Sequence, residues 1–247
     1  AEYDKALEYN FQSLVLREAE GGKAEISITL NNIGLVYFKL HNYEGALKYY
    51  NQCLSLKEEV RDTVDLHLLY LNLGLCHLHL RNFKEAREYT LQGLEICGLK
   101  CDDLIRISGE FGLGEASYWL RDFEDAERHL KSSLKIARST GEKRWQAENL
   151  VYLGAVSIEK KEFKIAVEYL NEADTIARSA GYNQLMIEAY KYLSRLYNQT
   201  EDFKNAAVYQ NKYIQLSDSL IGQELVKNIG KIQANYEERE NIATIAS

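Results

Sequence analysis

The residues best suited to chemistry in this chain are its four cysteines and five histidines. The densest group is Cys76-His77, with His79 two residues further on. On a helix, residues two apart point to different faces, so these two histidines cannot share one metal ion. We expect His77 to occupy a core position and His79 to face outward. This group therefore predicts packing and not a metal site.

Cys97 and Cys101 are four residues apart and could approach each other at a helix end, which would allow a redox role. Cys53 and Cys76 instead occupy positions where small residues recur along the chain. Buried cysteine often acts as a small apolar side chain, so we interpret cysteine use here mainly as packing. Four cysteines without a dense framework favour a reducing compartment. We expect a cytoplasmic location, with an extracytoplasmic sensor whose leader was removed as the alternative.

The remaining histidines, His41, His67 and His129, fall on predicted turns or surfaces without a matching nucleophile. Neither a G-x-x-x-x-G-K-[ST] loop nor a G-x-G-x-x-G loop is present, so the usual nucleotide sites lack support. We expect no catalytic residue, no cofactor and no metal, and hence no enzyme within these 247 residues. An alternative is a catalytic domain outside this stretch, to which the repeats described below would present a substrate.

The net charge of -7 argues against nucleic acid and against an acidic membrane surface as partners. No run of 18 or more apolar residues occurs, so we expect no membrane insertion. Proline is absent, although average usage would supply roughly a dozen. A chain without proline has nothing to interrupt long helices. The composition therefore predicts an all-helical protein.

Self-similarity at a period of 40 residues organises the chain. An aromatic residue recurs at Tyr3, Tyr43, Phe83, Phe123, Phe163 and Phe203, with alanine three residues after each. A glycine recurs at Gly34, Gly74, Gly114 and Gly154, with Ser194 in the fifth place. Within a unit the apolar spacing is helical, and a two-residue break such as His41-Asn42 separates two helices. Because each helical hairpin is apolar on two faces, the hairpins must stack.

These features resemble the tetratricopeptide repeat family, whose pattern is Trp, Leu-Gly, Tyr, then Ala, Phe, Ala and Pro. The second unit matches it with Tyr70, Leu73-Gly74, His77, Phe83, Ala86, Thr90 and Gly93. The resemblance covers about residues 1–217 and implies a right-handed α-solenoid of antiparallel helix hairpins, similar to such regions in bacterial signalling proteins. Three features depart from the pattern. The period exceeds the family's usual value of about 34, the terminal proline is missing, and Glu110 stands where a large apolar residue belongs, so this helix is expected to be shifted or partly exposed.

The repeat divides the chain into seven parts. Residues 1–20 are expected to be the second helix of a partial repeat, which suggests further repeats upstream. Five repeats follow at 24–61, 64–101, 103–141, 143–181 and 183–217. Ser217-Asp218-Ser219 predicts the start of a separate helix over 218–240, either a capping helix or a coiled-coil-like helix that dimerises.

In the family that the chain resembles, ligands lie in a concave groove lined by the first helix of each hairpin. Carrying those positions over predicts a partner groove that is apolar and aromatic toward the N-terminus and charged toward the C-terminus. Its residues are Asn31, Leu35, Phe38, Leu71, Leu75, Leu78, Phe111, Glu115, Tyr118, Trp119, Lys191 and Arg195. The apolar part is expected to accept an amphipathic helix or an extended segment. The alternative is that superhelical curvature buries these side chains against neighbouring units.

Lys191 and Arg195 could together hold an anionic group, but Glu159 and Glu188 are expected to neutralise them as ion pairs. The family resemblance therefore implies a protein- or peptide-binding scaffold. We expect it to be the sensory or interaction region of a larger bacterial signalling protein, with the C-terminal helix as a relay. A free-standing adaptor that organises partner proteins is the alternative, and the two differ in whether the C-terminal helix forms a homodimer.

Overall fold

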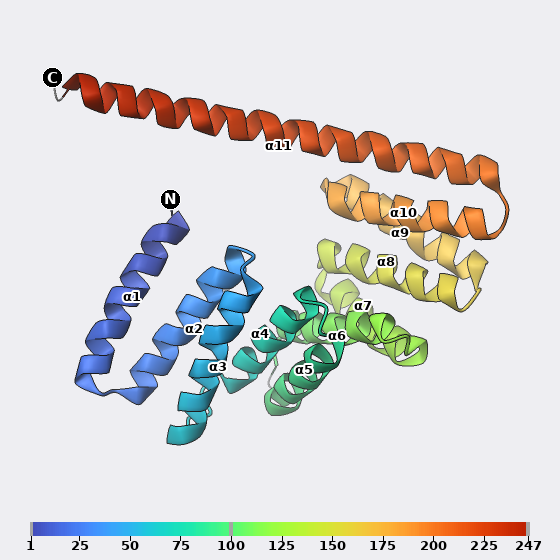
Figure 1. Cartoon of the computed structure of the whole chain (residues 1–247). Helices are drawn as coiled ribbons and strands as arrows, with labels where there is room; N and C mark the ends of the chain where they lie inside the picture. Colours follow the sequence, from blue (N-terminus) through green and yellow to red (C-terminus); the bar gives the residue numbers. More distant parts are fainter. Residues whose placement is uncertain (1, 99–100, 246–247) are drawn as a thin grey trace.

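The computed structural model describes residues 2–98 and 101–245. All regular structure in this part of the chain is helical, and consecutive helices pair along a curved array (Figure 1). The helices are α1 (Glu2–Glu20), α2 (Lys23–Lys39), α3 (Tyr43–Val60), α4 (Leu66–His79), α5 (Phe83–Cys97), α6 (Asp103–Trp119), α7 (Phe123–Thr140), α8 (Lys143–Glu159), α9 (Phe163–Ala180), α10 (Asn183–Gln199) and α11 (Phe203–Ile245). The fold is the predicted α-solenoid of helical hairpins.

The turn inside each complete hairpin contains one left-handed residue. His41, Arg81, Arg121, Lys161 and Glu201 have φ between 57° and 64°. The residue after three of them caps the second helix. Asn42 accepts a hydrogen bond from the Gly45 amide at 2.9 Å, and Asp122 and Asp202 do the same three residues ahead. These side chains satisfy amides that have no partner inside the helix. The predicted two-residue break is confirmed.

The recurrent glycines stand where the two helices of one hairpin cross. A Cβ on Gly34 would lie 2.6 Å from the Tyr50 ring. A Cβ on Gly154 would lie 2.6 Å from Leu170 Cγ. Real Cβ atoms do not approach other atoms so closely, so the helices can pack at this distance only without a side chain here. The expected packing role of these glycines is confirmed.

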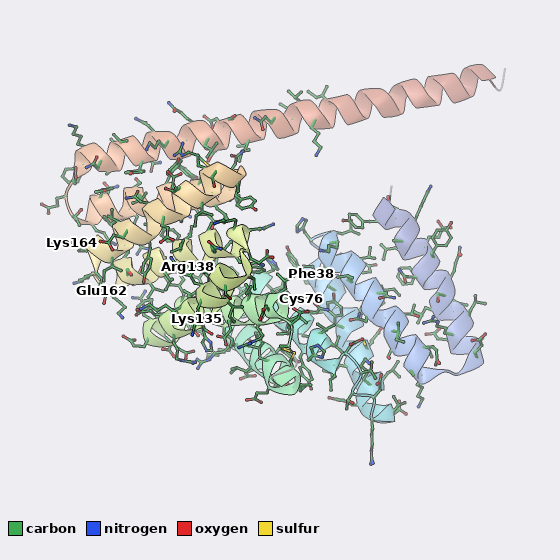
Figure 2. The ribbon with its side chains drawn as sticks, turned by 180° about the vertical axis from the view of Figure 1, so that it is seen from behind. Phe38, Cys76, Lys135, Arg138, Glu162 and Lys164 are labelled. Carbon is green, nitrogen blue, oxygen red and sulfur yellow. A yellow bond between two sulfur atoms is a disulfide. The ribbon has the colours of Figure 1, made fainter. Side chains whose placement is uncertain are left out.

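The recurrent aromatics join one hairpin to the next. Tyr43 of α3 stacks on His79 of α4, with ring centroids 4.4 Å apart. Phe83 of α5 stacks on Trp119 of α6 at 5.6 Å. Figure 2 labels Phe38 and Cys76, which lie together in the apolar cluster that α2, α3 and α4 share. Cys53 and Cys76 are fully buried there, as expected for residues chosen for their small size.

Two sequence-based expectations about single residues, free cysteines and a surface position for His129, are corrected, and the expected partial exposure at Glu110 is confirmed. Cys97 and Cys101 form a disulfide, with their Cα atoms 5.1 Å apart, across the connection from α5 to α6. Disulfides persist mainly in oxidising compartments, so this bond weakens the argument for a cytoplasmic location. His129 is buried, and its Nδ1 lies 2.7 Å from Oε2 of Glu110. The departure at Glu110 is therefore matched by a buried imidazole, and α6 keeps its place in the array.

The expectation of a helix start at Ser217-Asp218-Ser219 is wrong, because α11 runs without a break from Phe203 to Ile245. Tyr213 and Leu216 pack against Leu185 and Met186 of α10, which holds the helix in place as it enters this segment. α11 runs antiparallel to α10 and continues well past the first residue of α10, back toward the N-terminal side of the array, so that its C-terminal end lies above α1 in the view of Figure 1. One helix thus serves first as a cap and then as an extension.

Candidate partner-binding surface

The first helices of the hairpins form a layer of their own. α4 contacts α6, α6 contacts α8, and α8 contacts α10, in addition to the contacts each makes with its hairpin partner. Because consecutive first helices touch, this layer is the inner side of the curved array. We call the side chains that α2, α4, α6, α8 and α10 present away from the second helices the first-helix surface. The predicted groove residues are all on these helices.

The apolar part of the predicted groove is largely buried. Leu71 is 7% exposed, Leu78 9% and Tyr118 7%. The reason is local: a Cβ on Gly93 would lie 2.8 Å from Leu71 Cγ, so this glycine brings α5 close enough to cover that side chain. The space beside Leu71, Leu75 and Leu78 has a volume of about 10 Å³, room for about one water molecule. Leu71, Leu78 and Tyr118 are therefore core residues, and the prediction that they line an open groove is wrong.

Other predicted groove residues remain accessible. Leu35 is 41% exposed and Trp119 is 40% exposed. Asn31, Phe38, Leu75 and Phe111 are half-buried. Trp119 keeps one face against Phe83, and the Arg81 guanidinium lies 5.2 Å from the Trp119 ring centroid. Part of the predicted apolar surface is thus accessible, on α2, α4 and α6.

The charged part of the surface contains an ion pair, as expected. Arg195 of α10 donates a hydrogen bond of 2.5 Å to Glu159 of α8. Arg121 adds a second contact to Glu159 at 3.6 Å. Lys191 is exposed. Because Arg195 is committed to Glu159, the structural ion-pair interpretation of this arginine is confirmed.

Three carboxylates gather between α6, α8 and α10 with tyrosines among them. Tyr152 of α8 donates a hydrogen bond of 2.6 Å to Glu115 of α6. Burial raises the pKa of Glu115, and the nearby charges of Glu188 and Glu148 raise it further, while the hydrogen bond from Tyr152 lowers it. We call Glu115, Glu148, Glu188, Tyr152 and Tyr192 the carboxylate–tyrosine cluster.

The other two carboxylates of this cluster have the same character. Burial raises the pKa of Glu148, although Arg144 lies 2.9 Å away and lowers it. Burial also raises the pKa of Glu188, with the Glu148 charge adding to the effect and Lys191 opposing it weakly. Glu127 in another part of the array shows the contrast: hydrogen bonds from Lys131 and Lys160 lower its pKa. Burial and mutual repulsion therefore disfavour the charged form of these carboxyl groups, and a cation placed among them would favour it.

Aromatic rings of α6 and α8 pack against one another beside these carboxylates. The Phe111 ring centroid lies 5.4 Å from that of Tyr152 and 5.5 Å from that of Trp145, both edge to face. The Tyr118 ring lies 5.8 Å from Tyr152. Such rings can contact a cation or an aliphatic chain through their faces. The arrangement is suited to a ligand that carries positive charge on an apolar stem.

Tyr152 and Tyr192 were missed by the sequence-based site prediction. A signal for them exists in the repeat. The residue two positions before each recurrent glycine or serine is Asn32, Asn72, Gly112, Tyr152 or Tyr192 in successive units. Small or polar residues in the first three units give way to tyrosine in the last two. This change marks the units whose inner surface differs from the rest.

Comparison with known proteins supports the repeat assignment. Residues 1–59 and 25–98 match the family model described as "Tetratricopeptide repeat". Residues 1–98 are thus similar to the tetratricopeptide repeat family. The helix pairs after residue 98 continue the same hairpin architecture. No curated protein matches the sequence.

Solved structures share the fold at low sequence identity. BtubC from P. vanneervenii has a TM-score of 0.66 and 17% identity, and the match covers 90% of this chain and 93% of that one. A Rap protein complexed with competence and sporulation factor has a TM-score of 0.66 and 20% identity, covering 79% and 54%. A signal transduction ATPase with a tetratricopeptide repeat sensor from Pyrococcus horikoshii has a TM-score of 0.67 and 20% identity, covering 83% and 32%. The chain spans about half and about a third of the latter two proteins.

In the described part of the chain, no helix has the length and apolar character needed to cross a membrane.

Proposed function

We propose that this chain is a protein- or peptide-binding scaffold whose first-helix surface holds a segment of a partner. The carboxylate–tyrosine cluster carries the proposal, because it combines aromatic contact area with three neighbouring carboxyl groups whose charged form a cation would stabilise. Burying such charge against an apolar partner would be costly, whereas a lysine or arginine side chain would compensate it. The partner segment is therefore expected to be cationic where it meets α6, α8 and α10.

The scaffold is further proposed to be the interaction or sensory region of a larger bacterial signalling protein. The similar fold of a Rap protein bound to a factor, and of a sensor region in a signal transduction ATPase, supports this context. The alternative is a free-standing adaptor. The polypeptide mass of the native full-length protein distinguishes them, since a sensor region is covalently joined to an effector domain and an adaptor is not.

The binding proposal is tested by selecting short peptides from a displayed random library on the purified chain. Selected sequences should be enriched in lysine and arginine. Binding measured by fluorescence anisotropy should fall at least tenfold in the Glu115→Gln/Glu188→Gln double variant. Both substitutions keep the side-chain shape, and glutamine at position 115 still accepts the hydrogen bond from Tyr152.

The matched control is Glu88→Gln/Glu168→Gln, which removes two charges from exposed positions on the second helices α5 and α9. This control should bind like the wild type. Equal loss in the control and the double variant would mean that overall charge, and not the cluster, attracts the peptides. Selected peptides without any excess of cationic residues would contradict the proposed ligand class.

A further inference from the structure

A hollow on the outer side of the array lies between the second helices α9 and α11. Its volume is about 350 Å³, which is within the range of small-molecule sites. Both helices contact α10, and buried side chains of α10 form the base of the hollow. The residues that line it are Arg178, Met186, Tyr190, Lys212, Gln215, Leu216 and Ser219. None of these lining residues is acidic, and two are cationic.

The repeat shows that one charge at this hollow is reversed relative to the preceding unit. Forty residues earlier, Arg138 of α7 donates a hydrogen bond of 2.7 Å to Glu172 of α9. The same two positions in the last unit are Arg178 and Lys212. Two positive side chains thus line the gap that an ion pair bridges in the preceding unit. An anion placed between them would lower the electrostatic energy.

The contacts of Arg178 hold its guanidinium in place and still leave N–H donors. Its Nη2 donates hydrogen bonds of 2.7 Å to Asp174 and to the Tyr190 hydroxyl. A guanidinium carries five N–H donors, so these bonds do not exhaust it. The Tyr190 hydroxyl in turn donates to Asp174 at 2.8 Å, so each oxygen of this carboxylate already accepts a hydrogen bond. Asp174 balances one of the two positive charges, and the other remains.

Lys212 supplies the second charge from α11. Its ammonium nitrogen lies 4.6 Å from the Tyr209 ring centroid and 5.5 Å from that of Tyr190. Aromatic rings attract a cation without neutralising it, so the ammonium can still bind an anion. Gln215 and Ser219 lie on the same helix and add an amide and a hydroxyl, both of which can donate to an anionic oxygen.

The base of the hollow is apolar. Met186 and Tyr190 of α10 are 8% and 3% exposed, and Leu216 of α11 packs against them. We infer that this hollow binds a small organic anion. The carboxylate or phosphate group of the ligand lies between Arg178 and Lys212, and its apolar body covers the base. This site does not depend on the proposed binding of a cationic segment by the first-helix surface.

The ligand class is tested by calorimetric titration of the purified chain with benzoate and with phenyl phosphate. At least one of them should bind and raise the melting temperature, and the tighter one identifies the anionic group. Benzyl alcohol has the ring without the charge, and inorganic phosphate has the charge without the ring. Both should bind at least tenfold more weakly than the tighter aromatic anion. If neither aromatic anion binds, or if inorganic phosphate binds equally well, the proposal is wrong.

The position of the site is tested with Lys212→Glu. This change restores the glutamate of the preceding unit, so Arg178 should pair with it as Arg138 pairs with Glu172. The variant should melt at or above the wild-type temperature and bind the tighter probe at least tenfold more weakly. Lys204→Glu makes the same charge change at an exposed position of α11 outside the hollow and should bind like the wild type. Equal loss in both variants, or undiminished binding by Lys212→Glu, would overturn the assignment.

Discussion

Tyr152 and Glu115 connect two consecutive first helices through a hydrogen bond of 2.6 Å. The two residues are 37 positions apart, so the bond joins different hairpins. Burial raises the pKa of Tyr152, and the adjacent carboxylate raises it further, so the phenol keeps its proton and acts as the donor. This contact belongs to the proposed binding surface and also to the packing of α6 on α8.

Removing this donor should destabilise the array. Tyr152→Phe leaves Glu115 partly buried without the phenol, and hydrogen bonds to charged groups contribute about 1.5–3 kcal/mol. We expect a loss of that order in the free energy of unfolding, measured by urea denaturation at neutral pH. Tyr9→Phe, at a residue 69% exposed on α1, is the control and should change stability by less than about 0.5 kcal/mol. Equal effects of the two substitutions would contradict the contact's importance.

Glu188 gives the protein a specific pH dependence. Because burial raises the pKa of Glu188, the folded state holds this proton more tightly than the unfolded state. Its contribution to stability is therefore present at acid pH and is lost as pH rises through the folded-state pKa. Glu188→Gln removes this loss. We expect the melting temperature of the variant to exceed that of the wild type at pH 7, with the difference vanishing near pH 4. A constant difference across that range would show that the carboxyl titrates normally.

Two glycines on first helices should respond in opposite directions to alanine. In Gly154→Ala the new methyl would lie 2.6 Å from Leu170 Cγ, and overpacking of this kind costs about 1–3 kcal/mol. In Gly112→Ala the nearest atom, Thr90 Cγ2, is 4.0 Å away. Alanine favours a helix over glycine by about 0.5–1 kcal/mol, so this variant should be more stable. Thermal or urea unfolding measures both, and the same sign of change in the two variants would contradict the packing described.

The disulfide between Cys97 and Cys101 should stabilise the connection from α5 to α6. It closes a short loop, for which the chain-entropy model gives about 2 kcal/mol. We expect Cys97→Ser/Cys101→Ser to lose stability of that order. Adding a reductant should lower the melting temperature of the wild type and leave that of the variant unchanged. A thiol assay on the unfolded chain checks the bond directly: two reactive thiols mean that the disulfide is formed, and four mean that it is not.

The helices and turns could be predicted from the sequence because each unit repeats the same local signals. The capping residue at Asn42 and the glycine at Gly34 act within one hairpin, and their consequences do not depend on distant parts of the chain. The same hairpin structure is then repeated every 40 residues along the array. The helices and turns could therefore be predicted from interactions between residues that are close in the sequence.

The surface could be predicted only in part, because exposure depends on how closely neighbouring hairpins approach. Leu71 and Asn31 are 40 residues apart and occupy equivalent positions on first helices, yet Leu71 is 7% exposed and Asn31 is half-buried. The difference comes from Gly93, which lets α5 cover Leu71. Burial of His129 has a similar origin, since its partner Glu110 stands on the other helix of the hairpin. Periodicity assigns a residue to a helix face but does not say what covers that face.

The order of contacts along the array also bears on how the chain folds. Among the described residues, helices that share an extended contact are separated in sequence by at most one other helix. Contact order is therefore low, and little loop-closure entropy opposes the formation of any single contact. Folding can begin at whichever hairpin forms first and spread to its neighbours. The contacts between stacked hairpins that stabilise the array thus form between segments that are close in sequence. The chain need not bring distant segments together in order to fold.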